Sequence, residues 1–273
     1  MVEKSIGIFD SGIGGLTVLK EIIKVLPYEH TIYLGDTARV PYGNKSPQTI
    51  KRYALEDAQF LITKGIKLLV IACNTASALS TSFLRGTLEL PIVEVIEPGA
   101  KKAAQSTKAK KVGVIGTEAT IKSGAYASHI KKINPGIEVV SRACPLFVPL
   151  VEETWDEGED KSYLCELKML TVTRYLKALK ESGIDALVLG CTHYPLLKDA
   201  IEKFIGTQVT LIDSAEATAA EVSRVLTKEN LLNPSMVKGN HKYFVTDAAE
   251  RFTALGARFL GAALGEVAEV ALG

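Results

Sequence analysis

The sequence contains little cysteine and little proline, and neither sign of charge predominates. Among 273 residues there are 4 Cys and 10 Pro, and 32 Lys and Arg stand against 31 Asp and Glu. Four cysteines are too few for a disulfide framework in a chain of this length, so free thiols are expected. A formal net charge of +1 provides no field that would hold a polyanion, so no nucleic-acid partner is expected. With 47% hydrophobic and 23% charged residues, the composition is typical of a globular protein.

Long apolar runs are also missing. The first ten residues lead directly into a strand-like segment, without the charged start and apolar stretch of a signal peptide. The longest uncharged run, residues 68–84, is interrupted by polar side chains and is shorter than the roughly 18–20 apolar residues that a membrane span needs. We therefore expect a cytoplasmic protein without a membrane segment.

Short apolar segments alternate with longer segments of helical spacing along the chain. This alternation predicts an α/β fold, and segments that are apolar throughout suit parallel sheets covered on both faces. The expected strands are residues 5–10, 31–36, 66–73, 91–95, 111–117, 137–142, 184–191, 208–213 and 242–247. The expected helices include residues 14–26, 47–64, 162–182 and 215–227, and an apolar C-terminal helix, 254–272, that would cover its own domain or a neighbouring copy.

An internal repeat relates the two halves of the chain. Residues 65–75 align with residues 183–193, which places one cysteine of each segment in register. Residues 4–10 align in the same way with residues 110–116. The simplest explanation is two similar α/β halves.

The aligned cysteines, Cys73 and Cys191, each stand at the end of a predicted strand, just before polar residues that can begin a helix. A helix N-terminus lowers the pKa of a thiol from its ordinary value of about 8.5. If the halves face one another, the two thiols meet in one cleft. The halves could equally lie back to back, and a cysteine at the end of an apolar run can also be simply a small buried hydrophobic residue. Cys144 and Cys165 lack such a setting and are expected in the core.

Polar residues gather at the carboxyl ends of the predicted strands, where parallel α/β sheets bind their ligands. Two of them, Asp213 and Asp247, are followed three residues later by Glu216 and Glu250, a reciprocal capping pattern, so we expect them to cap helices. The remaining candidates for a functional site are Asp10, Ser11, Asp36, Thr37, Asn74, Thr75, Thr117, Thr192 and His193.

A pair of thiols suits one kind of reaction in particular. Two acid/base groups on opposite faces of a carbon atom can remove a proton from one side and return a proton on the other, which is racemisation. The α-hydrogen of an amino acid is weakly acidic, so the carbanion needs positioned hydrogen-bond donors and a site that excludes water. Donors of this kind are Ser11, Asn74, Thr75, Thr117 and Thr192. Asp10, Asp36 and His193 could hold the protonation state of the thiols or bind the ammonium group.

No cofactor and no metal are expected. Nothing in the sequence marks a lysine or a phosphate-binding loop for pyridoxal phosphate, the usual electron sink for such chemistry. Cys191 and His193 lie two positions apart, but no CxxC motif or second histidine cluster accompanies them to complete a metal site.

Four motifs, in order along the chain, carry a resemblance to a known family. They are FDSGIGGLTV at residues 9–18, GDTARVPYG at 35–43, ACNTA at 72–76 and GCTHYP at 190–195. Together they resemble the bacterial glutamate racemases, in the aspartate/glutamate racemase family. The resemblance runs from about Lys4 to Thr253, nearly the whole chain.

The resemblance implies an activity and an architecture. The activity is the cofactor-independent interconversion of L- and D-glutamate, which supplies D-glutamate for peptidoglycan. The architecture is a pair of similar α/β domains, each a mainly parallel sheet flanked by helices, related by a pseudo-twofold axis around a central cleft. Residues 1–97 and 208–273 would form the first domain, and residues 98–207 the second. The resemblance also implies a homodimer.

The resemblance assigns roles residue by residue. Cys73 is expected to act on D-glutamate and Cys191 on L-glutamate, assisted by Asp10 and His193 respectively. Asp36 and Glu152 match polar positions with a supporting role, although without the family Asp36 reads as a helix cap and Glu152 as a surface residue. The expected substrate contacts are Asp10, Ser11, Pro41, Tyr42, Gly43, Asn74, Thr75, Thr117, Thr120, Thr192 and His193.

Other functions stay open on the residues alone. A dinucleotide-binding oxidoreductase is one, because Gly12 and Gly14 follow the first predicted strand, although Thr17 stands where a third glycine is needed. Closer alternatives are an aspartate racemase and a thiol hydrolase that uses Cys191 and His193 as nucleophile and base. A non-catalytic amino-acid-binding module is a further alternative.

Overall fold

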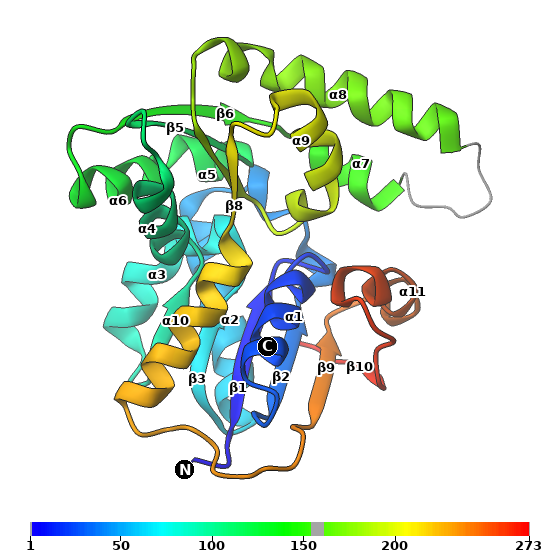
Figure 1. Ribbon diagram of the computed structural model, residues 1–273. Helices are drawn as coiled ribbons and strands as arrows, with labels where there is room; N and C mark the ends of the chain where they lie inside the picture. Colours follow the sequence, from blue (N-terminus) through cyan, green and yellow to red (C-terminus); the bar gives the residue numbers. More distant parts are fainter. Residues whose placement is uncertain (1, 154–160, 273) are drawn as a thin grey trace.

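The computed structural model describes residues 2–153 and 161–272. Within these ranges the strands form two parallel sheets, which lie in two lobes that we call the first and second domains (Figure 1). The first sheet has the order β10 (Val267–Glu269), β9 (His241–Val245), β2 (Thr31–Gly35), β1 (Ser5–Asp10), β3 (Ile66–Ile71), β4 (Ile92–Glu94). The second sheet has the order β6 (Glu138–Ala143), β5 (Lys111–Gly116), β7 (Ala186–Gly190), β8 (Thr210–Asp213).

The two sheets repeat one topology. In the first, β1 lies between β2 and β3, with β4 beyond β3; in the second, β5 lies between β6 and β7, with β8 beyond β7. The predicted α/β fold with two similar parallel-sheet halves is therefore confirmed. Strands β9 and β10 extend the first sheet beyond β2, so the C-terminal segment returns to the first domain (Figure 1).

The boundary expected at residue 207 places residues 208–213 in the first domain. In the structure these residues include β8, which pairs with β7 so that Thr210 lies opposite Ala186 and Asp213 opposite Leu189. The expected boundary is therefore wrong for this strand, because its backbone hydrogen bonds belong to the second sheet. We propose that the second domain ends at Asp213.

Helices cover both faces of the first sheet. On one face α1 (Leu16–Val25) packs against α10 (Ser214–Lys228) and α11 (Ala249–Leu260). On the other face α2 (Pro47–Thr63) packs against α3 (Asn74–Thr87) (Figure 1). Coverage on both faces explains why the strands are apolar throughout.

Alternation along β1 divides the core into two layers. Ile8 belongs to a buried cluster with Leu19 of α1, whereas its neighbour Phe9 belongs to a second cluster with Ala58 of α2. Successive side chains of a strand point to opposite faces, so the two clusters are the two sides of the sheet. The cluster that contains Ile8 continues into the second domain.

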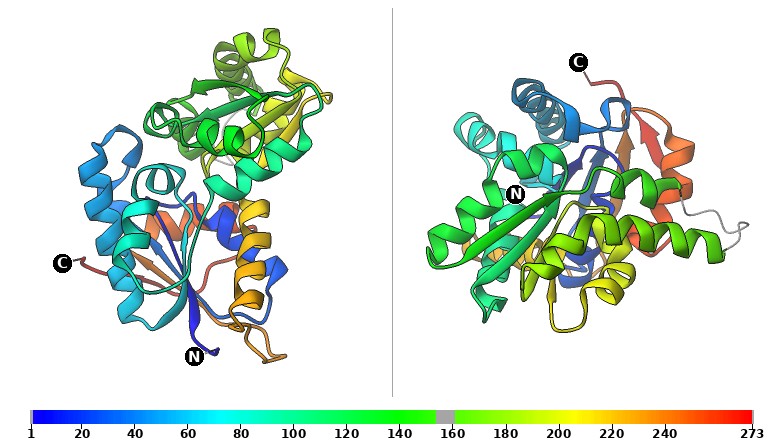
Figure 2. Two further views of the ribbon diagram at one scale, coloured as in Figure 1. Left: turned by 90° about the vertical axis from the view of Figure 1, so that its left-hand side faces the viewer. Right: turned by 90° about the horizontal axis from the view of Figure 1, so that it is seen from above.

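The second domain has its own helices, and Figure 2 shows it as a separate lobe on the first. Its α-helices are α4 (Ile96–Ser106), α5 (Glu118–Lys122), α6 (Ala125–Ile133), α7 (Phe147–Glu153), α8 (Lys161–Glu181) and α9 (Lys198–Ile205). Of the short 3-10 helices, η3 (Tyr194–Leu197) follows β7 in this domain, whereas η1 (Thr37–Arg39) and η2 (Tyr42–Asn44) follow β2 in the first. Helix α4 contacts both α6 and α10, and so joins the domains. None of the helices in the described ranges has the length and apolar character needed to span a membrane.

Two of the expected helix boundaries differ from the structure. Asp213 caps α10 by accepting the Ala215 N–H at 2.8 Å, as predicted. Asp247 does not cap α11, because Ala248 occupies the cap position with a φ of 55°. The expected C-terminal helix over residues 254–272 is also wrong: α11 ends at Leu260, Gly261 caps it with a φ of 78° that suits glycine, and β10 follows.

Candidate active site

A cavity of about 480 Å³ lies between the two domains, and residues of both form its wall. Of the expected catalytic and substrate-binding residues, it is lined by Ser11, Pro41, Tyr42, Gly43, Cys73, Asn74, Thr75, Thr117, Glu152, Cys191, Thr192 and His193. These residues come from the carboxyl ends of β1, β3, β5 and β7 and from two segments after β2 and β6. The two halves of the repeat therefore face one another across one cavity, and a back-to-back arrangement of the halves is excluded.

Cys73 connects β3 to α3. It is the N-cap of α3, where its sulfur accepts the Ala76 N–H at 3.5 Å, and its thiol lies 3.6 Å from Ser11 Oγ. Burial raises the pKa of the Cys73 thiol to about 12, and the negative charge of Asp10 adds to the increase. The helix N-terminus does lower the pKa of this thiol through the Ala76 N–H, but desolvation outweighs that effect, so the expected net decrease in pKa is wrong.

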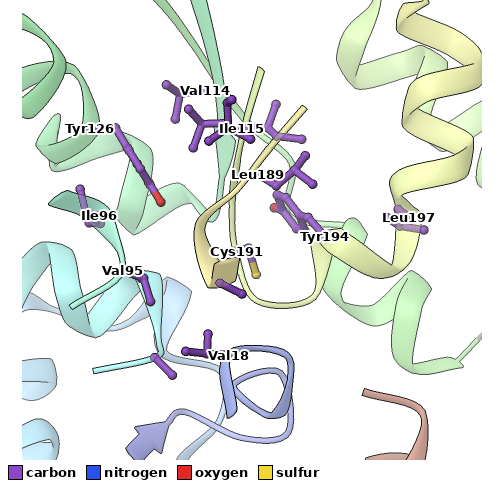
Figure 3. Packing of buried hydrophobic residues seen from close by; sticks show 14 of the residues in the cluster. Val18, Val95, Ile96, Val114, Ile115, Tyr126, Leu189, Cys191, Tyr194 and Leu197 are labelled. Atoms are coloured by element: carbon purple, nitrogen blue, oxygen red, sulfur yellow. The ribbon is translucent and has the colours of Figure 1, made fainter. Parts of the chain in front are cut away.

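Cys191 follows β7 at the equivalent point of the second sheet. Figure 3 shows it below Leu189 of β7, on the side of the second domain that faces Val18 of α1. Its sulfur lies 4.0 Å from His193 Nδ1, and the charge of Cys191 contributes to the raised pKa of Cys73. The two thiols therefore share both a cavity wall and an electrostatic environment. The short 3-10 helix η3, rather than an α-helix, follows Cys191.

The other two cysteines do not line this cavity, and all four in the sequence are free. Cys144 is buried, as expected. Cys165 is exposed on α8, so the expectation that it lies in the core is wrong.

His193 is held between Cys191 and Glu152. Its Nε2 atom lies 2.8 Å from Glu152 Oε1, while Nδ1 faces Cys191. Burial by itself would lower the pKa of His193, but its contacts with Cys191 and Glu152 raise the pKa to about 10. The pKa of Glu152 is in turn lowered by His193 and Arg251, which outweigh the opposing effect of burial. Arg251 NH2 of α11 lies 3.6 Å from Glu152 Oε2, so this carboxylate also links the domains.

Asp10 lies behind the cavity wall rather than on it. Its Oδ2 atom accepts the Gly12 N–H at 3.0 Å, and its buried Oδ1 has no hydrogen-bond partner within the described residues. Burial raises the pKa of Asp10, against the opposing charge of His193. Asp10 therefore acts on the site through its charge, which the pKa of Cys73 registers.

Gly14, which follows β1, allows a close contact between the domains. A Cβ atom on Gly14 would lie 2.2 Å from Thr192 Oγ1 and 2.5 Å from His193 Nδ1. The Thr17 hydroxyl also donates to the carbonyl oxygen of Thr192 at 3.2 Å. The space in front of Gly14 is filled by the His193 loop, so the structure does not support a dinucleotide phosphate there.

Hydroxyl and amide groups join the domains beside the thiols. Thr75 Oγ1 lies 2.9 Å from Thr117 Oγ1, which lies 2.9 Å from Thr120 Oγ1. Thr120 itself is not on the cavity wall. Asn74 Oδ1 accepts the Tyr126 hydroxyl at 2.7 Å, but Asn74 Nδ2 is buried without a partner among the described residues. Asn74 therefore has an unused donor on the residue that follows Cys73.

Asp36 is fully buried and does not line the cavity. Its Oδ2 atom accepts Arg39 Nε at 2.7 Å and also the Tyr42 hydroxyl, while Oδ1 accepts the Thr246 hydroxyl at 3.0 Å. The structure thus places Asp36 against the segment that carries Tyr42, and not beside either thiol.

Several lining residues were missed by sequence reasoning: Val40, Asn44, Glu118, Pro145, Val148 and Pro149. Val40 and Asn44 flank the Pro-Tyr-Gly motif, and Glu118 follows Thr117. Proximity in sequence to a motif residue was the available signal. Among the described residues, no group of three or more His, Cys, Asp and Glu side chains is placed to hold a metal ion.

Comparison with known proteins identifies the family of the chain. The model of the Asp/Glu/hydantoin racemase family matches residues 6–222. The chain belongs to this family. The family accounts for the two parallel-sheet α/β domains, and the chain is an amino-acid racemase, an isomerase.

Individual racemases match along their whole length. The glutamate racemase of Geobacter metallireducens is 59% identical over 272 residues, which cover 100% of this chain and 98% of that protein. A crystal structure of a glutamate racemase isoform from Bacillus anthracis superposes with a TM-score of 0.93 at 39% identity, covering 100% of this chain and 99% of that one. The Francisella tularensis glutamate racemase, solved in complex with D-glutamate, has a TM-score of 0.89 at 38% identity, with coverage of 100% and 99%.

Proposed function

We propose that this racemase interconverts L- and D-glutamate without a cofactor, using Cys73 and Cys191 as the two acid/base groups. The observation that carries the proposal is that one thiol from each half of the repeat lines the same cavity. The full-length similarity to proteins named glutamate racemase supports glutamate as the substrate. A structure of one such protein contains D-glutamate.

The two thiols have different surroundings, which suits opposite roles at one moment of the cycle. A pKa of about 12 keeps Cys73 protonated. In the proposed cycle Cys191 enters as the thiolate, and His193, whose Nδ1 lies 4.0 Å from its sulfur, assists proton transfer there. In this state Cys191 removes the α-proton of L-glutamate, and the Cys73 thiol donates its proton to the opposite face of the carbanion. When D-glutamate has dissociated, Cys73 is a thiolate and Cys191 is a thiol. This is the arrangement needed for the reverse reaction.

Neutral donors bind the negative charge of the substrate in this proposal. The described residues that line the cavity include no Lys or Arg. The unpartnered Nδ2 of Asn74 and the hydroxyls of Thr75 and Thr117 are suited to a carboxylate. Donors already in place when the carbanion forms stabilise it without reorganisation.

The test is to incubate the protein with pure L-glutamate in D2O, following the α-proton by NMR and the ellipticity at equilibrium. Loss of ellipticity together with deuterium incorporation at Cα supports the proposal. The same assay with L-aspartate tests the aspartate racemase alternative. An unchanged signal from glutamate at high protein concentration would contradict the proposal and favour a binding module.

The cellular role is also part of the proposal: a cytoplasmic homodimer that supplies D-glutamate for peptidoglycan. Expression of the chain should restore growth of a bacterium that requires added D-glutamate. Sedimentation equilibrium measures the dimer directly, and a monomer at micromolar concentration would contradict it.

Replacing Glu152 with glutamine should move the alkaline limb of the pH–rate profile for L-glutamate to lower pH by about 1–3 units, the usual effect of an adjacent charge. The raised pKa of His193, about 10, keeps this side chain protonated above neutral pH. Without the carboxylate of Glu152, His193 loses its proton at lower pH and can no longer assist the proton transfer at Cys191 as an imidazolium. The measurement is kcat/KM across the alkaline range.

The control for this experiment is Glu153→Gln. Glu153 also pairs with Arg251, at 3.0 Å, but its side chain is 72% exposed. Among the contacts between described residues, none joins Glu153 to His193. Its pH–rate profile should match that of the unsubstituted enzyme. An unchanged profile in Glu152→Gln would remove Glu152 from the proposed mechanism.

A further inference from the structure

One segment of the cavity wall is held by a buried cluster that lies away from the cavity. Pro41, Tyr42 and Gly43 form this part of the wall. The segment also touches the second domain, because a Cβ atom on Gly43 would lie 3.0 Å from Thr117 Cβ. Tyr42 is almost completely buried. Its hydroxyl group therefore determines where this part of the wall lies.

The Tyr42 hydroxyl contacts two carboxyl groups, although a phenol has one proton to donate. Its oxygen lies 2.9 Å from Asp57 Oδ2 and is also hydrogen-bonded to Asp36 Oδ2. Asp36 also accepts hydrogen bonds from Arg39 and Thr246, so both of its carboxylate oxygens act as acceptors. Asp57 Oδ1 accepts a hydrogen bond from Arg39 Nη2 at 3.0 Å. Asp57 Oδ2 is therefore the atom that can carry the proton for the second hydrogen bond of the Tyr42 oxygen.

The charges of the cluster support the same assignment. Asp36 and Asp57 are both fully buried, and two adjacent buried carboxylates do not ionise together readily. Burial raises the pKa of Asp57 well above its usual range, and the charge of Asp36 raises it further, against the opposing effect of Arg39. The titratable and charged groups that face Asp57 are Asp36, Arg39, Tyr42 and Glu56.

We propose that Asp57 is a protonated positioning residue, whose carboxyl group donates to the Tyr42 oxygen while Tyr42 donates to Asp36. Arg39 braces this chain by binding both carboxyl groups, and its guanidinium carbon lies 4.1 Å from the centre of the Tyr53 ring. The chain of hydrogen bonds fixes the wall segment against which substrate binds. Asp57 acts through Tyr42 and does not itself line the cavity.

The kinetic test compares Asp57→Asn with Asp57→Ala, and it rests on the proposed glutamate racemase function. An asparagine keeps one donor for Tyr42 and one acceptor for Arg39, so Asp57→Asn should retain kcat/KM within about threefold. Asp57→Ala removes both and should raise the KM for glutamate by about tenfold, with a smaller change in kcat. An Asp57→Asn variant as impaired as Asp57→Ala would overturn the proposal, and so would an unchanged KM in Asp57→Ala.

A stability test does not depend on the reaction, and it decides the matter if Asp57→Ala fails to fold. A protonated Asp57 lets the folded protein hold a proton that the unfolded chain releases above about pH 4. As the pH rises from about 4 to 8, the Tm of the unsubstituted protein should therefore decrease relative to the Tm of the Asp57→Asn variant. A constant difference in Tm would overturn the proposal. The control is Glu56→Gln, because Glu56 pairs with the guanidinium group of Arg39, as Asp57 does. This variant should not show the trend in Tm.

The two tests separate the two hypotheses. If the unsubstituted protein does not racemise glutamate but the Tm difference follows the expected trend, the proposed function fails and the protonated Asp57 stands. If racemisation occurs and the Tm difference is constant, the proposed function stands and the protonated Asp57 fails.

Discussion

Alanine in place of either Cys73 or Cys191 should reduce kcat for racemisation by about 10²- to 10⁴-fold in both directions, the usual contribution of one acid/base group. In the proposed mechanism each thiol is the proton donor in one direction and the proton acceptor in the other, so the loss of one thiol should slow both directions. The measurement is the change in ellipticity of L- and of D-glutamate with each purified variant.

Deuterium exchange adds a sharper readout to the same variants. Cys73→Ala retains Cys191 and should still exchange the α-proton of L-glutamate slowly, without inversion. Cys191→Ala should show the same behaviour with D-glutamate. Cys165→Ala is the matched control, since Cys165 is exposed on α8 and away from the cavity, and it should keep full activity. Racemisation at the normal rate by either cavity variant would show that a single thiol suffices and would contradict the two-base proposal.

Replacing Lys67 with methionine should lower the free energy of unfolding by about 3–5 kcal/mol, the usual loss when one partner of a buried ion pair is removed. The Lys67 side chain is fully buried on β3, with Nζ 2.6 Å from Glu29 Oε2. Its ammonium group also donates to the backbone carbonyls of Val2 at 2.5 Å and Leu231 at 2.8 Å. The substitution leaves the carboxylate of Glu29 buried without a cation. Denaturant titration followed by circular dichroism measures the effect.

A surface pair provides the control for this prediction. Lys111 Nζ lies 3.0 Å from Glu138 Oε1, but these side chains are 26% and 61% exposed. Lys111→Met should change the free energy of unfolding by less than about 1 kcal/mol. Adding Glu29→Gln to Lys67→Met should recover part of the loss, because it removes the unpaired charge. Equal effects of Lys67→Met and Lys111→Met would show that burial does not determine the contribution of the pair.

Much of the site was accessible from sequence because strand ends in parallel sheets are predictable. The repeat placed Cys73 and Cys191 at equivalent strand ends, and the structure has both on one cavity wall. Glu152 was a weaker case: apart from the family resemblance it reads as a surface residue, yet it contacts His193 at 2.8 Å. That contact depends on how α7 approaches the loop after β7, which no local pattern encodes.

Asp57 illustrates a residue that sequence reasoning did not single out. It follows Glu56 within α2, and acidic residues in an amphipathic pattern are usually solvated. It is buried because Tyr42, fifteen positions earlier, reaches it from a separate segment. Likewise, the pKa of Cys73 was expected to fall but is raised, since burial and Asp10 outweigh the local helix N-terminus.

The sequence by itself determined the alternation of strands and helices, the internal repeat and the polar residues at strand ends. These features depend on side-chain periodicity and on backbone hydrogen bonds between near neighbours, which the local sequence specifies. The tertiary structure alone decided that the two halves face one cavity, that β8 completes the second sheet, and which charges are buried together. Desolvation and Coulomb interactions depend on every group within a few ångströms, and those groups come from segments far apart along the chain.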